Sequence, residues 1–310
     1  MKDLISIHDL SSSEVEEILN LAADLKDKQK QKIKHEYLWA KSMAMIFEKP
    51  STRTRVSFEI GMWQLGGLAI NLDQEAIGLG SRESIGDVAR TLSRFADAIL
   101  IRTFAHEKVI ELAKYASVPV INALSDLLHP CQALADIFTV REKKGHLKGI
   151  KFAYIGDGNN VCHSLMEAAS KIGMNLTIAT PKGFEPNEAI VETTFSEAKK
   201  HGVEIDIVND PVIAAKDADV IYTDVWASMG QEKQREAKNA KFKNFQVNEQ
   251  LTSLAKPDYL FMHCLPAHRG EEVTDGVIDS KHSVVFDQAE NRLHVQKAIL
   301  VKLLGGQNGQ

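Results

Sequence analysis

The stretch "MAMIFEKPSTRTRVSFE", residues 43–59, joins a run of apolar residues to a polar segment with helical character. The apolar run suits a buried strand, and the hydroxyl residues Ser51 and Thr52 are typical of a helix N-terminus. Arg53 and Arg55 follow at once. A protein core has little use for two arginines at a strand-to-helix turn. The stretch therefore predicts a βα unit with a functional role at its turn.

The alternation of short apolar runs with helical patterns continues along the whole chain. In the first half we expect strands at 43–47, 68–71, 98–103 and 118–123, with helices that begin near 51, 84 and 107 and a helix at 130–144. In the second half we expect strands at 151–156, 175–180, 203–208, 219–224 and 259–264. Alternating β and α elements favour parallel sheets covered by helices on both faces. The predicted fold class is α/β, with two doubly wound parallel-sheet domains.

The polar, glycine-bearing segment 143–149 marks the expected crossing between domains. We therefore predict domains at 1–145 and 146–310, with a last helix at about 287–304 that returns to the first domain. The opening helix is predicted from a capping-box pattern, Ser13 with Glu16. It carries an apolar stripe at helical spacing: Val15, Ile18, Leu19, Ala22 and Leu25.

Composition excludes several classes of protein. The 310 residues carry a net charge of −5, which argues against a broad basic face for nucleic acid. No apolar run approaches the ~18 residues that span a membrane. The N-terminal residues 1–17 include acids where a targeting peptide would be basic, so we expect a cytoplasmic protein. The three cysteines show no C-x-x-C spacing, which argues against a disulfide framework and a structural zinc site.

Six polar clusters follow six of the predicted strands. They lie at residues 49–55, 102–103, 129–132, 156–160, 224–230 and 263–270. In open α/β sheets ligands bind beyond the carboxyl ends of the strands. Solvated surface loops would not concentrate Arg, His, Asn and Cys at these places, so the clusters predict binding sites.

The segment "STRTR", residues 51–55, is suited to an anion. A helix N-terminus offers backbone N–H groups and the positive end of the helix dipole, and Arg53 adds a forked donor for phosphate oxygens. Arg55 lies two residues further on and points elsewhere, so we expect it in a structural ion pair. The chain has no G-x-x-x-x-G-K-[ST] segment. A small phosphate compound fits better than a nucleoside triphosphate.

Two other clusters resemble cofactor motifs without matching them. In "GDGNN", Gly156 and Gly158 follow a strand, but Val161 replaces the third glycine of a dinucleotide fingerprint and the next strand ends in Thr180 rather than an acid. In "HCLPAHRG", residues 263–270, the spacing of His and Cys matches no common zinc pattern, so we expect no metal. We expect a cis peptide bond before the proline of this segment.

Together these segments resemble a known family. "FEKPSTRTRVSFE", "HPCQALAD", "DVWASMGQE" and "MHCLPAHRGEEVTD" look like the signature segments of the ornithine carbamoyltransferases, in the aspartate/ornithine carbamoyltransferase superfamily. The resemblance runs from the first helix to "AENRLHVQKAIL", nearly the whole chain. It implies transfer of a carbamoyl group from carbamoyl phosphate to the δ-amine of L-ornithine, giving L-citrulline and phosphate. It also implies no metal or organic cofactor, no nucleic-acid or membrane partner, and a homotrimer or a multiple of trimers.

The resemblance also implies site residues. It places phosphate at Ser51, Thr52, Arg53, Thr54 and Arg102. It places the carbamoyl group at Thr54, Arg102, His129, Gln132, Cys264, Leu265 and Arg292. It places ornithine at Asn160, Asp224, Ser228 and Met229. The residues implied in catalysis are Arg102, His129 and Cys264.

The chemistry of the reaction constrains these roles. The nucleophile is a neutral amine whose pKa in solution is ~10.4, like that of lysine. A carboxylate beside it would stabilise the charged form, so Asp224 suits the α-ammonium and Cys264 suits the δ-amine, as an orienting group or as a base. Arg102, His129 and Thr54 are donors that can stabilise the oxyanion. We also expect residues 226–233, with Gly230 as a hinge, to close over ornithine.

One departure and two alternatives stay open. Many relatives carry a Gln or His at the position of Gly78 that reaches an adjacent subunit, and here Ser81 or Arg82 would have to replace it. The acceptor could be another amine, although Asp224 disfavours putrescine and acylated ornithine, which lack a free α-ammonium. The chain could also be a catalytically silent paralogue that binds amino acids, although the implied residues are intact.

Overall fold

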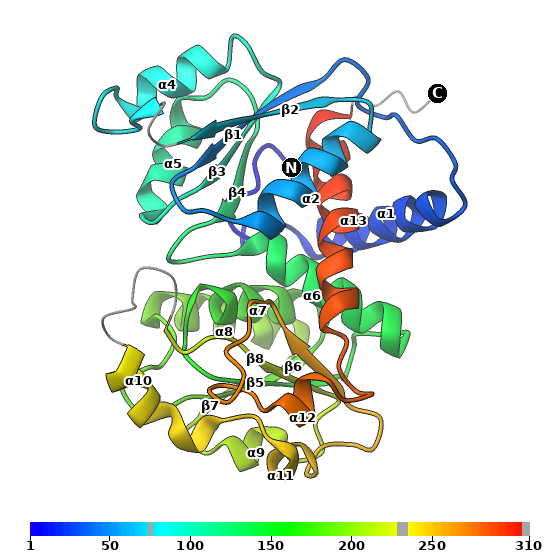
Figure 1. Ribbon diagram of the computed structural model, residues 1–310, viewed down its shortest axis with the longest axis vertical. Helices are drawn as coiled ribbons and strands as arrows, with labels where there is room; N and C mark the ends of the chain where they lie inside the picture. Colours follow the sequence, from blue (N-terminus) through cyan, green and yellow to red (C-terminus); the bar gives the residue numbers. More distant parts are fainter. Residues whose placement is uncertain (74–76, 228–234, 306–310) are drawn as a thin grey trace. The chain divides into compact units, whose positions relative to one another are not determined.

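A computed structural model describes residues 1–73, 77–227 and 235–305 of the chain. The chain forms two compact units (Figure 1). Unit 1 contains Met1–Phe138 and Glu290–Gln310, and unit 2 contains Thr139–Ala289. The chain passes from one unit to the other within α6 (Pro130–Lys144) and again within α13 (Val285–Leu304).

Unit 1 is built on a sheet of four parallel strands in the order β2-β1-β3-β4. The strands are β1 (Ser42–Phe47), β2 (Leu68–Asp73), β3 (Ala98–Arg102) and β4 (Val120–Leu124). The helices that lie wholly in this unit are α1 (Ser12–Lys30), α2 (Thr52–Gln64), α4 (Ile85–Leu92) and α5 (His106–Tyr115). Every residue of β3 is buried, as expected for a parallel strand covered on both faces.

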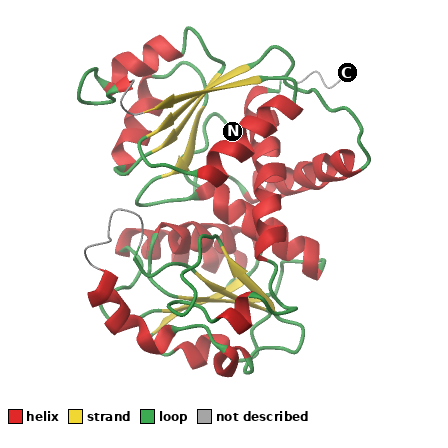
Figure 2. Ribbon diagram, viewed as in Figure 1, coloured by secondary structure: helices red, strands yellow, loops and turns green. Residues whose placement is uncertain are grey.

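Unit 2 is built on five parallel strands in the order β7-β6-β5-β8-β9. They are β5 (Lys151–Ile155), β6 (Asn175–Ala179), β7 (Ile205–Val208), β8 (Val220–Thr223) and β9 (Leu260–His263). The helices are α7 (Asn160–Ile172), α8 (Glu188–His201), α9 (Pro211–Ala215), α10 (Arg235–Phe242), α11 (Glu249–Thr252) and α12 (Asp275–Ile278), with a 3₁₀ turn at Lys243–Phe245. The prediction of two parallel α/β sheets with helices is confirmed (Figure 2).

The hydrophobic core of each unit lies between its sheet and its helices. In unit 2 the core includes an aromatic group, in which the ring of Phe242 stacks on Trp226 at 5.6 Å and makes an edge contact with Phe184 at 4.8 Å. In unit 1, Ile99 and Ile101 of β3 and Val109 and Leu112 of α5 belong to one cluster. Among the residues that the structure describes, no helix is long and apolar enough to cross a membrane.

The N-cap of the first helix lies two residues before the predicted cap. Its N-cap is Ser11, whose hydroxyl accepts from the backbone N–H of Glu14 at 3.1 Å while the Glu14 carboxylate accepts from the Ser11 N–H at 2.9 Å. The prediction of Ser13 with Glu16 was therefore wrong, because Ser11 and Ser13 each precede a glutamate at the same spacing. The predicted apolar stripe of this helix is buried as expected.

The strand order reverses once in each sheet, and these reversals fix where a ligand can bind. In unit 1 the reversal lies between β1 and β3, and in unit 2 it lies between β5 and β8. Beyond the carboxyl ends of such neighbouring strands the connections diverge to opposite faces and leave room for a ligand. The polar clusters that follow β1, β3, β5 and β8 lie at these two places.

Candidate active site

The N-terminus of α2 has the features predicted for an anion site. Ser51 is the N-cap, and its hydroxyl accepts from the backbone N–H of Thr54 at 3.2 Å. The first turn carries no acidic residue, so the positive end of the helix dipole is not offset there. Arg55 Nε donates to Glu59 Oε1 at 2.9 Å, which confirms the ion pair expected for Arg55. The two arginines of "STRTR" thus have different surroundings.

Three guanidinium groups lie near His129, and they come from three separate elements. His129 directly precedes α6 and is 5% exposed. Burial lowers its pKa well below the usual value, and the positive charges of Arg292, Arg102 and Arg53 lower it further. His129 is therefore neutral near pH 7, and one ring nitrogen carries a proton that it can donate. Positive charge gathered around a neutral imidazole favours an anionic ligand.

A hydrogen-bond network joins α13, α6 and α2 beside this imidazole. Arg292 donates from Nη1 to Gln132 Oε1 and from Nη2 to Thr54 Oγ1, each at 2.9 Å. Gln132 Nε2 in turn donates to Asp136 Oδ1 at 2.8 Å. Because Thr54 Oγ1 accepts from Arg292, its own hydroxyl proton is directed toward another acceptor. Asp136, which orients Gln132, was not predicted from the sequence.

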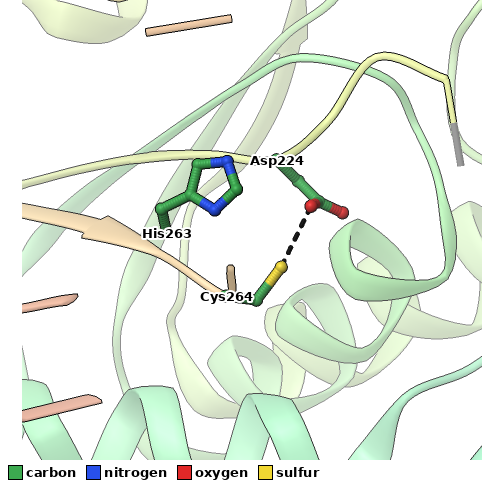
Figure 3. Close-up of side chains that lie close together, drawn as sticks. All are labelled: Asp224, His263 and Cys264. Atoms are coloured by element: carbon green, nitrogen blue, oxygen red, sulfur yellow. Dashed lines mark hydrogen bonds between the residues drawn. The ribbon is translucent and has the colours of Figure 1, made fainter. Parts of the chain in front are cut away.

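The second group of predicted residues lies in unit 2, where Asp224 follows β8 and Cys264 follows β9. Figure 3 shows the Cys264 thiol pointing at the Asp224 carboxylate, and the Sγ to Oδ1 distance is 3.0 Å. The backbone N–H of Val225 also donates to Oδ1, at 2.8 Å. Asn159 Nδ2 donates to the other oxygen, Oδ2, at 2.8 Å. Asn159 was missed by the sequence analysis, which assigned only its neighbour Asn160.

His263 shapes the loop after β9. Its Nδ1 accepts from the backbone N–H of Leu265 at 2.9 Å, and its Nε2 lies 3.2 Å from Glu272 Oε1. Leu265 has a φ of +56°, and the predicted cis bond between Leu265 and Pro266 is confirmed. A carboxylate oxygen of Asp224, a ring nitrogen of His263 and the sulfur of Cys264 lie within 4.8 Å of one another. Both nitrogens of His263 are engaged within the loop, so this residue positions Leu265.

The second glycine of "GDGNN", Gly158, has a packing role. A Cβ atom at Gly158 would lie 2.3 Å from the backbone nitrogen of Pro186, so only glycine fits against the segment after β6. Thr180 Oγ1 donates to the Phe184 carbonyl at 2.9 Å in the same segment. The close approach explains why this position is a glycine.

A buried ion pair lies beside the same turn. Lys238 Nζ donates to Asp157 Oδ2 at 2.6 Å and to the Trp226 carbonyl at 3.0 Å. Burial raises the pKa of Asp157, and the hydrogen bond from Lys238 opposes that shift. The pair connects α10 to the loop after β5, and the sequence analysis did not predict it.

Two predictions fall on or near residues that are not described. Ser228 and Met229, and all but 226–227 of the segment expected to close over ornithine, lie outside the described residues. Gly78 has a φ of +57°, and a Cβ atom there would lie 2.7 Å from Arg82 Cβ. The turn also has a hydrogen bond from Ser81 Oγ to the Gly78 carbonyl at 3.0 Å. Glycine is required by this turn whatever contact the turn makes.

Comparison with known proteins agrees with this architecture. The carbamoyl-P binding domain of aspartate/ornithine carbamoyltransferase matches residues 2–142, and the Asp/Orn binding domain of the same family matches residues 148–303. The chain therefore belongs to the aspartate/ornithine carbamoyltransferase family.

Within that family, the similar proteins are ornithine carbamoyltransferases. The enzyme of Anoxybacillus flavithermus is 57% identical over 303 residues, which cover 98% of this chain and 96% of that protein. The enzyme of Pyrococcus abyssi is 57% identical over 305 residues, which cover 98% and 96%. The solved structure of ornithine carbamoyltransferase from Pyrococcus furiosus has a TM-score of 0.97 at 55% identity and covers 99% of this chain and 98% of its own.

Proposed function

We propose that this protein transfers the carbamoyl group of carbamoyl phosphate to the δ-amine of L-ornithine and releases L-citrulline and phosphate. The observation that carries the proposal is the approach of Arg53, Arg102 and Arg292 to the neutral His129 beside the N-terminus of α2. A phosphorylated anion is the ligand that this arrangement suits. The printed names of relatives at 57% identity support the particular substrates.

Phosphate binding is assigned to the start of α2. Ser51, Thr52, Arg53 and Thr54 offer hydroxyls, backbone N–H groups and one guanidinium, and Arg102 at the end of β3 adds another. The leaving phosphate departs into this positively charged cradle, so its negative charge is stabilised without a metal or organic cofactor.

The carbamoyl group is assigned to Thr54, Arg102, His129, Gln132 and Arg292, with the backbone at Cys264 and Leu265. Attack by the amine turns the carbonyl oxygen into an oxyanion. Arg102, the Thr54 hydroxyl and the neutral His129 are donors that stabilise this charge as it develops. Arg292 orients both Thr54 and Gln132 through its two hydrogen bonds.

Ornithine binding is assigned to unit 2, at Asn160, Asp224, Ser228 and Met229. Asp224 suits the α-ammonium of ornithine, which should stay charged. Cys264 is assigned to the δ-amine, which must lose its proton before it attacks. Because the Cys264 thiol donates to Asp224, the lone pairs of its sulfur can accept an N–H of the δ-amine. This geometry favours the orienting role of Cys264 over the role of a base.

The setting of the enzyme is part of the proposal. We assign a homotrimer or a multiple of trimers, in arginine biosynthesis or in arginine and citrulline breakdown. All three cysteines are free, which supports a reducing compartment such as the cytoplasm. One similar protein, from Pyrococcus furiosus, is named an anabolic ornithine carbamoyltransferase.

The test is citrulline formation from carbamoyl phosphate with ornithine, putrescine, N-acetylornithine and aspartate compared as acceptors. We expect a strong preference for ornithine. We also expect the rate to rise as the pH increases toward ~10, the pKa range of the amine. Turnover of another acceptor would keep the phosphate site but overturn the role of Asp224. Absence of turnover with every acceptor would favour a silent paralogue.

A further inference from the structure

Asn159 makes a hydrogen bond to Asp224 that neither its role as a helix cap nor the proposed binding roles explain. It is the N-cap of α7, and its Oδ1 accepts from the backbone N–H groups of Val161 and Cys162 at 3.0 and 3.2 Å. The hydroxyl of Tyr154 donates to the same oxygen at 3.1 Å. The two backbone N–H groups fix which way the amide faces, since a rotated amide would present N–H₂ to them. The N–H₂ group of Asn159 therefore faces Asp224.

The residue that contacts Asn159 from the sheet, Tyr154, is fully buried. Tyr154 belongs to β5, is 0% exposed, and stacks on Tyr222 of β8 with ring centroids 5.7 Å apart. The single proton of its hydroxyl is shared between the Asp157 carbonyl, at 2.9 Å, and Asn159 Oδ1, at 3.1 Å. The amide is thus held from one side by the sheet and from the other by the first turn of α7.

This arrangement determines which donors contact each oxygen of the Asp224 carboxylate. Asn159 Nδ2 holds Oδ2 at 2.8 Å, which leaves Oδ1 for the Cys264 thiol at 3.0 Å and the Val225 N–H. Each carboxylate oxygen has its own donors, so the carboxylate has one preferred orientation. A neutral amide is suited to this task, since it donates to the carboxylate without adding a charge beside the thiol.

We propose that Asn159 is a positioning residue that acts on Cys264 through Asp224, by holding the carboxylate where it accepts the thiol proton. The consequence for catalysis rests on the proposed function, in which the Cys264 sulfur orients the δ-amine. The consequence for the thiol itself rests only on the geometry.

The expected chemistry follows from charge. The thiolate is the reactive form of a cysteine, and a carboxylate that accepts the S–H bond disfavours it. With Asn159 in place, Cys264 is kept as a thiol. Without the amide, Asp224 turns away from its fixed orientation, the thiolate fraction rises, and Cys264 reacts faster with an alkylating reagent.

The measurement is the alkylation rate of Cys264 in the folded full chain by iodoacetamide, followed by mass spectrometry at about pH 7.5, below the usual thiol pKa of ~8.5. Cys131 and Cys162 are 0% exposed, so the reaction reports on Cys264. Asn159→Ser keeps a hydroxyl that caps α7 but lacks the donor to Asp224. We expect it to raise the rate roughly threefold to tenfold, as an elevated thiolate fraction requires.

A double-mutant cycle separates positioning from capping. Asp224→Asn alone should also raise the rate, and adding Asn159→Ser in that background should raise it no further, because the residue through which Asn159 acts is gone. Asn159→Thr provides a second neutral cap without an amide, and it should behave like Asn159→Ser. The proposal would be overturned if Asn159→Ser and Asn159→Thr both left the alkylation rate unchanged. It would also be overturned if Asn159→Ser accelerated alkylation equally with and without Asp224.

Asn187→Ala is the matched control. Asn187 caps α8 in the same unit, where its side chain accepts from the Ala189 N–H at 3.0 Å. Its removal should lower the thermal midpoint about as much as loss of any cap, and it should leave the alkylation rate unchanged. A similar acceleration in Asn187→Ala would mean that loosened helices expose Cys264, and the proposal would fail.

Turnover adds a separate readout. In Asn159→Ser the KM for ornithine should rise about tenfold while the KM for carbamoyl phosphate stays unchanged, since loss of one hydrogen bond to a charged group is worth about 1.5 kcal/mol. The alkylation cycle needs no turnover. If the effect of Asn159→Ser on alkylation depends on Asp224 in a protein that makes no citrulline, the proposed function alone is refuted. If that dependence is absent in an active enzyme, the positioning role alone is refuted.

Discussion

The two predicted binding regions occupy equivalent places in their sheets and carry opposite charge. In unit 1, guanidinium groups surround a neutral imidazole beside a helix N-terminus. In unit 2, a carboxylate accepts from a thiol and an amide beside another helix N-terminus. Both follow strands at which the order of a parallel sheet reverses. We therefore propose that the fold determines where a ligand binds, and that the side chains after the strands determine which ligand it is.

The largest effect that would sharpen this comparison concerns the two arginines of "STRTR". Arg53→Leu removes a guanidinium from the group around His129, and we expect turnover to fall about 10²- to 10³-fold, the cost of one lost donor to developing charge. Arg55→Leu is the matched control, because Arg55 pairs with Glu59 in an exposed i,i+4 ion pair. Steady-state kinetics would check both variants. Equal losses in the two would show that the motif acts as a structural unit.

The next effect belongs to the carboxylate of unit 2. Asp224→Asn removes the charge assigned to the α-ammonium, and we expect the KM for ornithine to rise about 10- to 100-fold, as for loss of a charged hydrogen bond. The KM for carbamoyl phosphate should stay unchanged. Asp206→Asn, on the exposed side of β7, is the control and should alter neither value. A rise in both KM values for Asp224→Asn would contradict the division of substrates between the units.

A smaller effect separates packing from ligand binding in the glycine-bearing turn of unit 2. Gly158→Ala places a Cβ atom 2.3 Å from the Pro186 nitrogen, so we expect a loss of about 2 to 3 kcal/mol of unfolding free energy, as overpacking costs. At Gly183 a Cβ atom meets nothing within 4 Å, and a φ of +86° is the sole cost of alanine. Denaturant unfolding should show a smaller loss for Gly183→Ala. Equal stability of both variants would refute the packing explanation.

The smallest effect compares one buried lysine in each unit. Lys238 in unit 2 pairs with Asp157, whereas Lys297 of α13 donates to His35 Nε2 at 3.1 Å and Gln64 Oε1 at 3.0 Å. Burial lowers the pKa of Lys297 from 10.5 to about 8. Between these values the unfolded chain binds more protons than the folded chain, so this group adds stability as pH rises from 8 to 10.5 and loses it as pH falls through 8.

Lys297→Met should remove this dependence. We expect the change in unfolding free energy between about pH 7 and pH 10 to differ from that of the wild type by roughly 1 to 2 kcal/mol, somewhat less than the full shift would give. Denaturant unfolding at a series of pH values would measure it. Parallel pH profiles for the two proteins would show that Lys297 is charged and solvated in the folded state.

Much of the fold could be predicted because it depends on local patterns. Apolar runs such as 98–103 and the helix at 130–144 follow from periodicity, and the contrasting surroundings of Arg53 and Arg55 follow from helical geometry. The cap at Ser11 was predicted at Ser13 instead, since both serines fit the capping-box spacing and only the backbone torsions decide between them.

The parts that escaped prediction depend on tertiary orientation. Asn159 could have been recognised as a helix cap from its place before an apolar helix, but its amide meets Asp224 only because β5 and β8 are neighbours. Asp136 orients Gln132 one helical turn away, and Glu272 meets His263 across a loop. Residues that orient a predicted site residue through a side-chain hydrogen bond leave no periodic signal in a sequence.

The most direct test of the central claim is calorimetric titration of the full chain with inorganic phosphate. The account predicts that wild type and Asp224→Asn bind phosphate equally, and that Arg53→Leu binds it at least about tenfold more weakly, as loss of a charge-assisted hydrogen bond requires. Unchanged affinity in Arg53→Leu, or loss of binding in Asp224→Asn, would contradict the assignment of phosphate to the arginine-lined site of unit 1.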